Sequence, residues 1–560
     1  MSEPVQLIIR QARIVDGSGA PAYDGELAVA GDRIAAVGPR GSVPAVPGAT
    51  ELDAGGRVLA PGFIDIHTHY DPQLCWDRLA TPTPEHGVTS IVMGNCSIGM
   101  APVRPGHRRK LVSLFGSVED MESALLERTV PFAWESVAEY LAWQGRELGP
   151  NVGVLVGHAV LRLYVMGDAA QQRAATDDEI ARMAALLEEA LRAGALGLSF
   201  SFAHLDEAGH ELPCHHADRR ERLALLQAIA RAGRGVVEVA PQLLNPDEGL
   251  RQLDEFGALS LETGVMVSLS PLLQSRGRRE AWRELLARFE HWQARGAKLF
   301  AQTQVRPLDF TIRLSQGSAI LAKMPGWRAL LDLPVAERVR RFSDEAVRQA
   351  LQLEIDTAPG MAGLAGTFVV KRAMGPANRA LEGRRVREIA EERGRSFTDT
   401  LLDIALADGL ETEFNQAVAH TDAAIVGDLL DHPAVHIGSA DAGAHITQFS
   451  GAGDSGLLFE RYVRERGRLT LERAVQRLTS DLAGAWGLRQ RGALRPGWFA
   501  DLVLFDAATI GRGEEVWADD LPGGSGRYVR GARGIEAVWV NGQLLVEGGR
   551  YTDARPGRIV

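Results

Sequence analysis

Short apolar segments recur through the middle of the chain, and stretches with helical periodicity separate them. The first, PGFIDI, begins at residue 61, and the others are GVTSIVMGNC, NVGVLVGHA, ALGLSFS, GVVEVA, GVMVSLS, KLFAQTQV and AVHIGSAD. Continuous apolar runs of this length are typical of strands buried on both faces, and their alternation with helices indicates parallel βα units. Eight such strands are the number that closes a barrel. The pattern therefore predicts an α/β protein with a (β/α)8 TIM barrel over residues 61–489.

One of the intervening stretches shows clear helix boundaries. Thr176 and Glu179 have the spacing of a capping box, and Gly194 is placed to end the helix. Between them the apolar positions repeat with the helical period, at Ile180, Met183, Leu187 and Leu191. We expect a helix that packs this stripe on the barrel and carries no catalytic group.

Both ends of the chain have the alternating pattern of short strands. VQLIIRQARIVDG and GELAVAGDRIAAVG near the N-terminus are matched by ADLVLFD and EAVWVNGQLLVEGGRYT near the C-terminus. The dipeptide Asn541-Gly542 in the last of these is typical of a two-residue hairpin turn. Because strands this short need partners, we expect residues 1–60 and 490–560 to combine into one small β-sandwich domain.

The connection between the seventh and eighth apolar segments is longer than an ordinary βα connection. Its excess covers about residues 317–415. Long connections in compact domains usually carry structure or function of their own. We expect a mostly helical insertion that could cover the pocket of the barrel.

The composition limits the class of protein and its partners. The chain has 560 residues, of which 45% are hydrophobic and 24% charged, with a net charge of -11. An acidic chain is a poor match for nucleic acid or an anionic membrane, which attract basic patches, so we expect a small-molecule partner. Three scattered cysteines do not make a disulfide framework, and no segment has the pattern of a signal peptide or a membrane span. These features predict a cytoplasmic protein and leave open whether it forms a homo-oligomer.

Two histidines end the first apolar segment, in PGFIDIHTHY. Because side chains alternate along a strand, His67 and His69 point to one face, at the barrel edge where TIM-barrel enzymes keep their active sites. Two imidazoles there supply half of a divalent metal site. The same pair could instead cap the strand, so the other strand ends must decide between the two interpretations.

The second segment ends in Gly94-Asn95-Cys96, and the eighth contains Asp441. A cysteine is generally more often a small buried hydrophobic residue than a ligand. GNC after an HxH strand, however, resembles the D-aminoacylase, or N-acyl-D-amino-acid deacylase, branch of the amidohydrolase superfamily. The resemblance covers nearly the whole chain, through VGHAVLR, GALGLS, IGSADAGAH and RGALRPGWFADLVLFDA. It implies a metal site formed by His67, His69, Cys96 and Asp441.

Asp441 is the expected general base. A carboxylate beside a metal ion can bind the ion and accept a proton from the attacking water. The alternative is an aspartate that caps the following helix. His445, in the loop just beyond, could contact substrate or metal, or it could be an ordinary loop histidine.

The sequence departs from the deacylase pattern at two strand ends. The family has histidines at the fifth and sixth strands, where this chain offers Glu238 and then Ser268 and Ser270. Glu238 could replace an imidazole as a ligand, or it could be a buried carboxylate paired with an arginine. The fourth strand has no lysine, so a carbamylated-lysine bridge is excluded and cyclic amides are poor substrate candidates. With so few ligands, we expect one Zn²⁺ ion rather than two.

Further candidates come from a longer-chain subgroup of deacylase-like amidohydrolases, which this sequence also resembles. The shared features are HYDPQ after the histidine pair, His204-x-Asp206 after the fourth strand and Arg306-Pro-Leu after the seventh. Arg306 could bind a substrate carboxylate through its two parallel donors, or it could form a salt bridge at the barrel rim. The resemblance thus adds His204, Asp206 and Arg306 as substrate-binding candidates. His158, which ends the third strand, is a further candidate for polarising the substrate.

These features together predict a metal-dependent hydrolase of an amide C–N bond, with an N-acyl amino acid as the expected substrate. One alternative is a hydrolase of another amide, a small peptide or a lactone. Another is a barrel that binds a ligand without catalysis. We favour an enzyme, because a non-catalytic barrel has no chemical need for His67, His69, Cys96 and Asp441 together.

Overall fold

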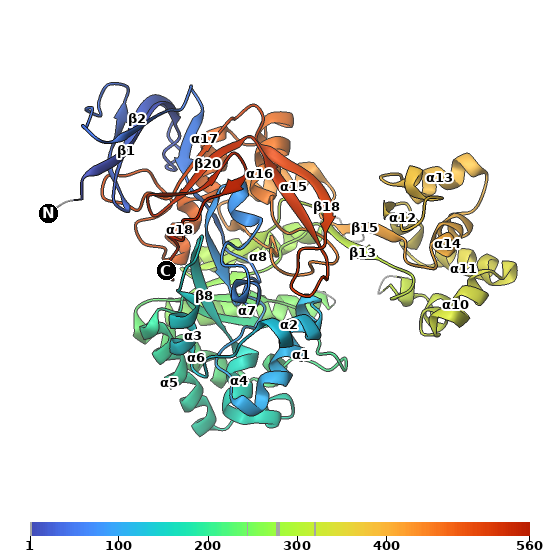
Figure 1. Cartoon of the computed structure of the whole chain (residues 1–560). Coiled ribbons are helices and arrows are strands. Elements are labelled where there is room, and N and C mark those ends of the chain that lie inside the picture. The colour runs from blue at the N-terminus through green and yellow to red at the C-terminus, as the bar shows by residue number, and fades with distance from the viewer. Residues whose placement is uncertain (1–2, 243–244, 276–279, 319–320) are drawn as a thin grey trace. The chain divides into compact units, whose positions relative to one another are not determined.

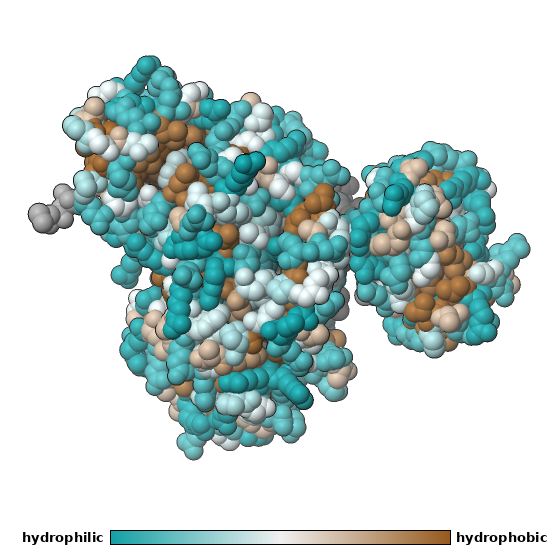
Figure 2. All heavy atoms as spheres, viewed as in Figure 1, coloured by the Kyte–Doolittle hydropathy of each residue, from teal (hydrophilic) through white to brown (hydrophobic). Residues whose placement is uncertain are grey.

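The computed structural model describes residues 3–242, 245–275, 280–318 and 321–560. The chain divides into two compact units. The first unit comprises Met1–Leu272, Trp282–Val305 and Ala424–Val560, and the second comprises Leu273–Ala281 and Arg306–Ala423. On the face shown in Figure 2, hydrophilic residues cover most of each unit. Among the described residues, no helix combines the length and the apolar character needed to cross a bilayer.

The first unit contains an eight-stranded parallel sheet built from the eight apolar segments. Its neighbouring strands follow chain order: β6 (Phe63–Asp65), β7 (Val88–Met93), β8 (Asn151–Gly157), β9 (Gly197–Ser201), β10 (Val236–Ala240), β11 (Met266–Leu269), β12 (Leu299–Thr303) and β16 (Val435–Ile437). Just beyond the first and last strands, Thr68 and Ala442 form a parallel bridge. The curled sheet therefore fits the predicted (β/α)8 barrel, with its first and last strand ends brought together.

Helices of the first unit connect these strands, as parallel pairing requires. Figure 1 shows α3 to α6 grouped on one side of β8. The helix expected after Thr176 is α5, Asp177–Ala193, with both halves of the capping box formed and Gly194 in the left-handed conformation that ends it. The other helices are α1 (Arg108–Glu119), α2 (Ser123–Thr129), α3 (Val137–Gln144), α4 (His158–Met166), α6 (Arg219–Ala232), α7 (Pro246–Thr263), α8 (Ala281–Ala294), α15 (Ala423–Asp431), α16 (Asp454–Leu457), α17 (Leu471–Leu478) and α18 (Ser480–Trp486).

The two chain ends share one mixed sheet, in the order β22-β21-β20-β17-β5-β1-β2-β3, with β4 also paired to β1. Its strands are β1 (Val5–Ile14), β2 (Tyr23–Ala30), β3 (Arg33–Pro39), β4 (Thr50–Asp53), β5 (Val58–Pro61), β17 (Leu502–Phe505), β20 (Ile535–Val540), β21 (Gln543–Glu547) and β22 (Arg550–Tyr551). The pairing of β5 with β17 joins N-terminal and C-terminal strands. A hairpin, β18 (Gly511–Ala518) with β19 (Arg527–Arg533), is separate. The strands of both chain ends thus pair in one mixed sheet, and the expected sandwich is not confirmed.

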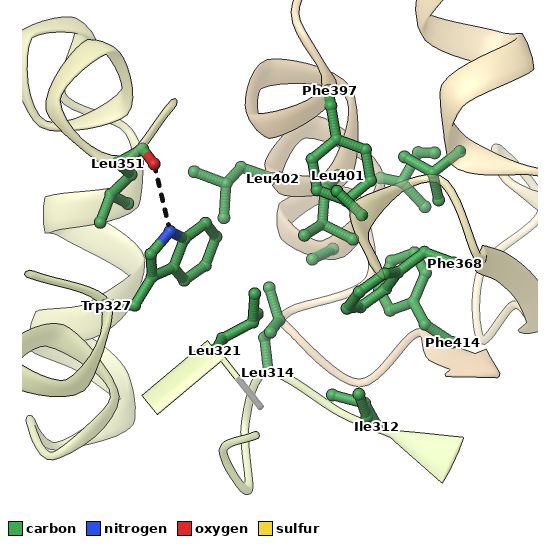
Figure 3. Close-up of a cluster of buried hydrophobic side chains, with 14 of the residues drawn as sticks. Ile312, Leu314, Leu321, Trp327, Leu351, Phe368, Phe397, Leu401, Leu402 and Phe414 are labelled. Atoms are coloured by element: carbon green, nitrogen blue, oxygen red, sulfur yellow. Dashed lines mark hydrogen bonds between the residues drawn. The ribbon is translucent and has the colours of Figure 1, made fainter. Parts of the chain in front are cut away.

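The second unit has its own small sheet and core. Strands β13 (Leu308–Ile312), β15 (Glu413–Ala419) and β14 (Phe368–Arg372) form an antiparallel sheet with β15 in the middle. Its helices are α9 (Pro325–Leu331), α10 (Val335–Phe342), α11 (Glu345–Thr357), α12 (Met361–Ala365), α13 (Val386–Arg393) and α14 (Phe397–Ala407). In Figure 3, Phe368 and Phe414 of the strands lie near Leu401 and Phe397 of α14, and the Trp327 indole N–H donates to the Leu351 carbonyl at 3.3 Å. The segment between the seventh and eighth barrel strands is thus a folded unit rather than an extended loop.

Candidate metal centre

Three potential metal ligands meet at the carboxyl ends of β6 and β7. The ligand atoms of His67, His69 and Cys96 all lie within 4.8 Å of one another. The three residues are only 2%, 1% and 7% exposed. The His67 Nε2 atom lies 3.6 Å from the Cys96 sulfur, which shows that the first two strand ends place their donors together.

Asp441 reaches the same place from beyond β16. Its Oδ1 atom lies 3.3 Å from the Nε2 atom of His67 and 3.7 Å from that of His69. Two backbone hydrogen bonds hold the segments side by side, from Asp441 N to His67 O at 3.2 Å and from His69 N to Ala442 O at 2.8 Å. The Asp441 side chain is 25% exposed, whereas both histidine side chains are almost fully buried. The carboxylate therefore lies at the accessible side of the cluster.

The backbone that presents these groups is strained. Cys96 has a φ of 53° and Asp441 a φ of 54°, in the left-handed region that residues with a Cβ rarely adopt. Such conformations persist where surrounding contacts hold them, and they cluster at functional sites. At Ser97, which has a φ of 67°, the backbone N–H donates to the Ser199 hydroxyl at 3.0 Å, and that hydroxyl donates to Gly94 O at 2.6 Å. Buried hydrogen bonds thus fix the turn that carries the Cys96 thiol.

Glu238, on β10, is fully buried beside this turn. Its Oε2 atom accepts a hydrogen bond from Cys96 N at 3.1 Å, and its Oε1 atom lies 3.9 Å from His67 Nδ1. Oε1 has no hydrogen-bond partner among the described residues. The contacts that the structure gives this carboxylate are therefore with the proposed ligands.

Each histidine has an acceptor behind its other ring nitrogen. The Nδ1 atom of His67 forms a hydrogen bond with Gln302 Oε1 at 3.2 Å. The Nδ1 atom of His69 lies 3.2 Å from Glu119 Oε1, which is the distance of an ion pair, and neither of these two atoms has a hydrogen-bond partner among the described residues. The sequence analysis identified neither Gln302 nor Glu119. A signal for Glu119 existed, because it falls on the buried stripe of α1 at helical spacing from Val112 and Phe115.

Burial and charge set the protonation of the two histidines in opposite directions. Burial lowers the pKa of His67 to about 4, although Asp441 favours its charged form. Burial also opposes the charged form of His69, but Glu119 and Asp441 outweigh it and raise the pKa of His69 to about 9. His67 is thus neutral at neutral pH, and His69 shares its proton with carboxylates.

The acidic groups of the centre repel one another. Burial, chiefly, raises the pKa of Glu238 to about 8 and that of Glu119 to about 8. Burial also raises the pKa of Cys96 well above its usual value, and Glu238, Glu119 and Asp441 add to this rise. A cation bound among them would favour their ionised forms. The donor set of two imidazoles, a thiol and carboxylates therefore fits a divalent metal ion.

Two further predicted residues lie close to the centre. His204 Nδ1 pairs with the Ser201 hydroxyl at 2.7 Å, and burial, followed by the nearby His445 and His69, lowers the pKa of His204 to about 3. His445 donates its backbone N–H to the Glu119 carbonyl at 2.8 Å. His204 is thus within electrostatic range of the proposed ligands, and His445 is within electrostatic range of His204.

Other predicted residues have contacts elsewhere. His158 Nε2 pairs with Glu221 at 2.8 Å inside the barrel wall. The Asp206 carboxylate accepts from the Gln171 side chain at 2.9 Å and from backbone N–H groups of its own loop. Arg306 belongs to the second unit, where its Nη1 atom lies 3.8 Å from Asp309. The contact of His158 stabilises the barrel wall, and the contacts of Asp206 stabilise its own loop.

Comparisons with known proteins find deacylases that are similar to this chain over nearly its whole length. The N-acyl-D-aspartate deacylase of Alcaligenes xylosoxydans xylosoxydans is 29% identical over 569 residues, which cover 99% of this chain and 94% of that protein. A solved D-aminoacylase, described as having a binuclear metal centre, has a TM-score of 0.67 at 27% identity, covering 99% of both chains. The N-acyl-D-glutamate deacylase of Bordetella bronchiseptica, solved with zinc and a phosphonate inhibitor, has a TM-score of 0.65 at 26% identity, again covering 99% of both chains. Residues 50–546 match the model of the amidohydrolase family, and the chain belongs to that family.

Proposed function

We propose that this protein is a metal-dependent deacylase that hydrolyses the amide bond of N-acyl amino acids. The observation that carries the proposal is the buried cluster of His67, His69 and Cys96, with ligand atoms within 4.8 Å of one another. The Asp441 carboxylate lies 3.3 Å from one of these ligands. Relatives that align over the full chain include a D-aminoacylase, 29% identical, which supports this substrate class.

The donor set favours zinc. Imidazole, thiolate and carboxylate ligands together suit Zn²⁺ better than Mg²⁺ or Ca²⁺, which prefer oxygen. When bound, such an ion supplies a Lewis acid that polarises the amide carbonyl and activates water. Glu238 is the additional ligand that we propose, because its buried Oε1 atom has no hydrogen-bond partner among the described residues.

We propose one ion rather than two. Ser268 and Ser270 stand where the deacylase pattern has a histidine, and a hydroxyl is a much weaker zinc ligand than an imidazole. The Ser270 hydroxyl is 2.5 Å from the Ser439 hydroxyl, so it already has a partner. In the proposed number of metal ions, this chain differs from the solved D-aminoacylase that is described as having a binuclear metal centre.

Asp441 is the group that we propose as general base. It lies beside both histidines and is the accessible member of the cluster, so water and substrate can reach it. Its carboxylate takes the proton of the attacking water and passes it to the leaving amine. His204 and His445 are the substrate contacts that we propose, because His204 is buried within electrostatic range of His67, His69, Asp441 and His445. The residues of the proposed site thus have three roles: metal ligands, a general base and substrate contacts.

A substrate screen tests the proposal. The purified, zinc-loaded protein would be offered N-acetyl derivatives of D- and L-amino acids that carry acidic, neutral and basic side chains, with amine release as the readout. We expect hydrolysis of at least one of these compounds and loss of that activity on chelation. Zinc-dependent hydrolysis of lactones or small peptides, with every N-acyl amino acid left intact, would replace the proposed function with one of its alternatives.

A further inference from the structure

The two histidines of the proposed metal centre are supported by chemically different groups. Gln302, a neutral amide on β12, lies behind His67, and Glu119, an acid at the end of α1, lies behind His69. Histidine ligands commonly donate the N–H that does not face the metal to an acceptor, which fixes the tautomer and the ring orientation. A carboxylate acceptor also makes the imidazole a stronger electron donor.

The location of Glu119 is unfavourable for stability. The residue is only 2% exposed, and it occupies a position of α1 that belongs to the buried apolar face. Burying a carboxylate is costly without a strong partner. It is also the last residue of its helix, where the negative end of the helix dipole disfavours an acid. Neither cost is explained by packing, so a role toward its neighbour His69 is the remaining reason for an acid here.

The same helix end also holds the loop beyond Asp441. The Glu119 carbonyl accepts the backbone N–H of His445 at 2.8 Å. The next residue, Asp120, accepts from the Gln448 side chain at 2.8 Å and from the Thr447 hydroxyl at 3.3 Å. The end of α1 therefore contacts a ligand from the first strand and the loop that follows the eighth.

We propose that Glu119 is a positioning residue, which orients His69 through its carboxylate and anchors the His445 loop through its carbonyl. The proposal deepens the function stated above and rests on the proposed metal centre. It assigns α1, which carries no ligand of its own, the role of positioning a ligand from the first strand and the loop that follows the eighth strand.

Substitutions at Glu119 and Gln302 separate orientation from charge. Glu119→Gln keeps the shape and an acceptor oxygen but removes the negative charge, whereas Glu119→Ala removes both. Partners of this kind typically contribute about 10- to 100-fold to metal affinity. We expect Glu119→Ala to weaken zinc binding by about that much, Glu119→Gln by less and Gln302→Ala by least, because an amide polarises the imidazole less than a carboxylate does.

Zinc affinity, measured by competition with a chromophoric chelator, is the direct test. Glu122→Gln is the matched control, because Glu122 is an exposed acid three residues along the chain. Thermal unfolding of the metal-free proteins is measured in parallel. We expect Glu119→Gln to leave metal-free stability unchanged or raised, since it replaces a buried ionisable group by a neutral amide of the same shape, while zinc affinity falls. If Glu119 had a merely structural role, the substitution would lower metal-free stability and leave zinc affinity unchanged.

A double-mutant cycle with His69→Ala separates the effect of Glu119 on His69 from any general loss of stability. If Glu119 acts through His69, the change Glu119→Gln has no further effect on zinc affinity once the imidazole is absent. If Glu119→Gln binds zinc as tightly as the parent does, this inference is wrong, and the proposed function is unaffected. A parent that binds no zinc overturns the proposed function, and the inference with it.

Discussion

The two units of this protein bury acidic side chains in different ways. In the second unit, Glu413 is fully buried, and its carboxylate accepts from Arg372 Nη2 at 2.8 Å and from Arg313 Nε at 3.0 Å. In the first unit, Glu238 and Glu119 are equally buried but face histidines instead of arginines. Glu413 has two permanently charged arginines as its partners, whereas Glu238 and Glu119 lie beside imidazoles, which can also bind a metal ion. The difference separates a structural carboxylate from the carboxylates of the proposed metal centre.

The largest expected effect concerns the base. Asp441→Asn keeps size and shape but removes the proton acceptor, and general-base steps contribute about 10²- to 10⁴-fold in rate. We expect the variant to fold, to retain zinc through His67, His69 and Cys96, and to lose at least about a hundredfold in turnover of the substrate found in the screen. Zinc content and rate must be measured on the same preparation. If the zinc-loaded variant matches the parent rate, another group is the base.

The paired acid of the second unit provides the contrast. Glu413→Gln leaves Arg313 and Arg372 without their shared countercharge. Breaking a buried ion pair costs about 3–5 kcal/mol, and the partial exposure of both arginines reduces the expected loss to about 2 kcal/mol. Chemical denaturation should show this loss of stability, while zinc content per folded chain stays at the parent value. Reduced zinc content at unchanged stability would contradict the distinction between the two kinds of acid.

Glu238 tests the other side of the comparison. Glu238→Gln should lower zinc affinity by about tenfold or more with little change in the fold, because an amide is a far weaker ligand than a carboxylate. Ser268→Ala is the matched control, since Ser268 is buried and pairs with Glu238 in the adjacent strand. We expect the control to bind zinc like the parent. Unchanged zinc content and activity in Glu238→Gln would make this glutamate structural.

A smaller, pH-dependent effect is expected at His436, which is buried on β16 and stacks on Phe300 with ring centroids 4.4 Å apart. Burial, with a contribution from Arg477, lowers the pKa of His436 to about 3, well below its value in the unfolded chain. The folded state therefore resists protonation, so stability is present above about pH 6.5 and falls as the pH decreases toward 3. His436→Phe cannot titrate and should remove about 2 kcal/mol of the stability lost between pH 7 and pH 5. Unfolding free energies at both pH values check this, and an identical pH dependence in parent and variant would contradict it.

The sequence was sufficient for features that depend on local periodicity. His67 and His69 share a face because strand side chains alternate, and each apolar segment became a barrel strand. The capping box at Thr176 likewise depends only on residues within one helix turn. The burial of Glu119 could be predicted from the apolar stripe of α1. Its contact with His69, like the contact of Gln302 with His67, joins segments far apart in the chain, which no local pattern contains. The sequence predicted that the two chain ends combine but did not predict their single mixed sheet, because the partner of each strand, such as β17 for β5, lies far away in the chain.

The central claim is that His67, His69 and Cys96 hold a zinc ion. Elemental analysis of the purified protein, with His67→Ala and Cys96→Ala prepared in parallel, tests it most directly. The account predicts about one zinc ion per chain in the parent and little in either variant. A parent without stoichiometric metal after zinc supplementation, or variants that hold as much zinc as the parent, would contradict it.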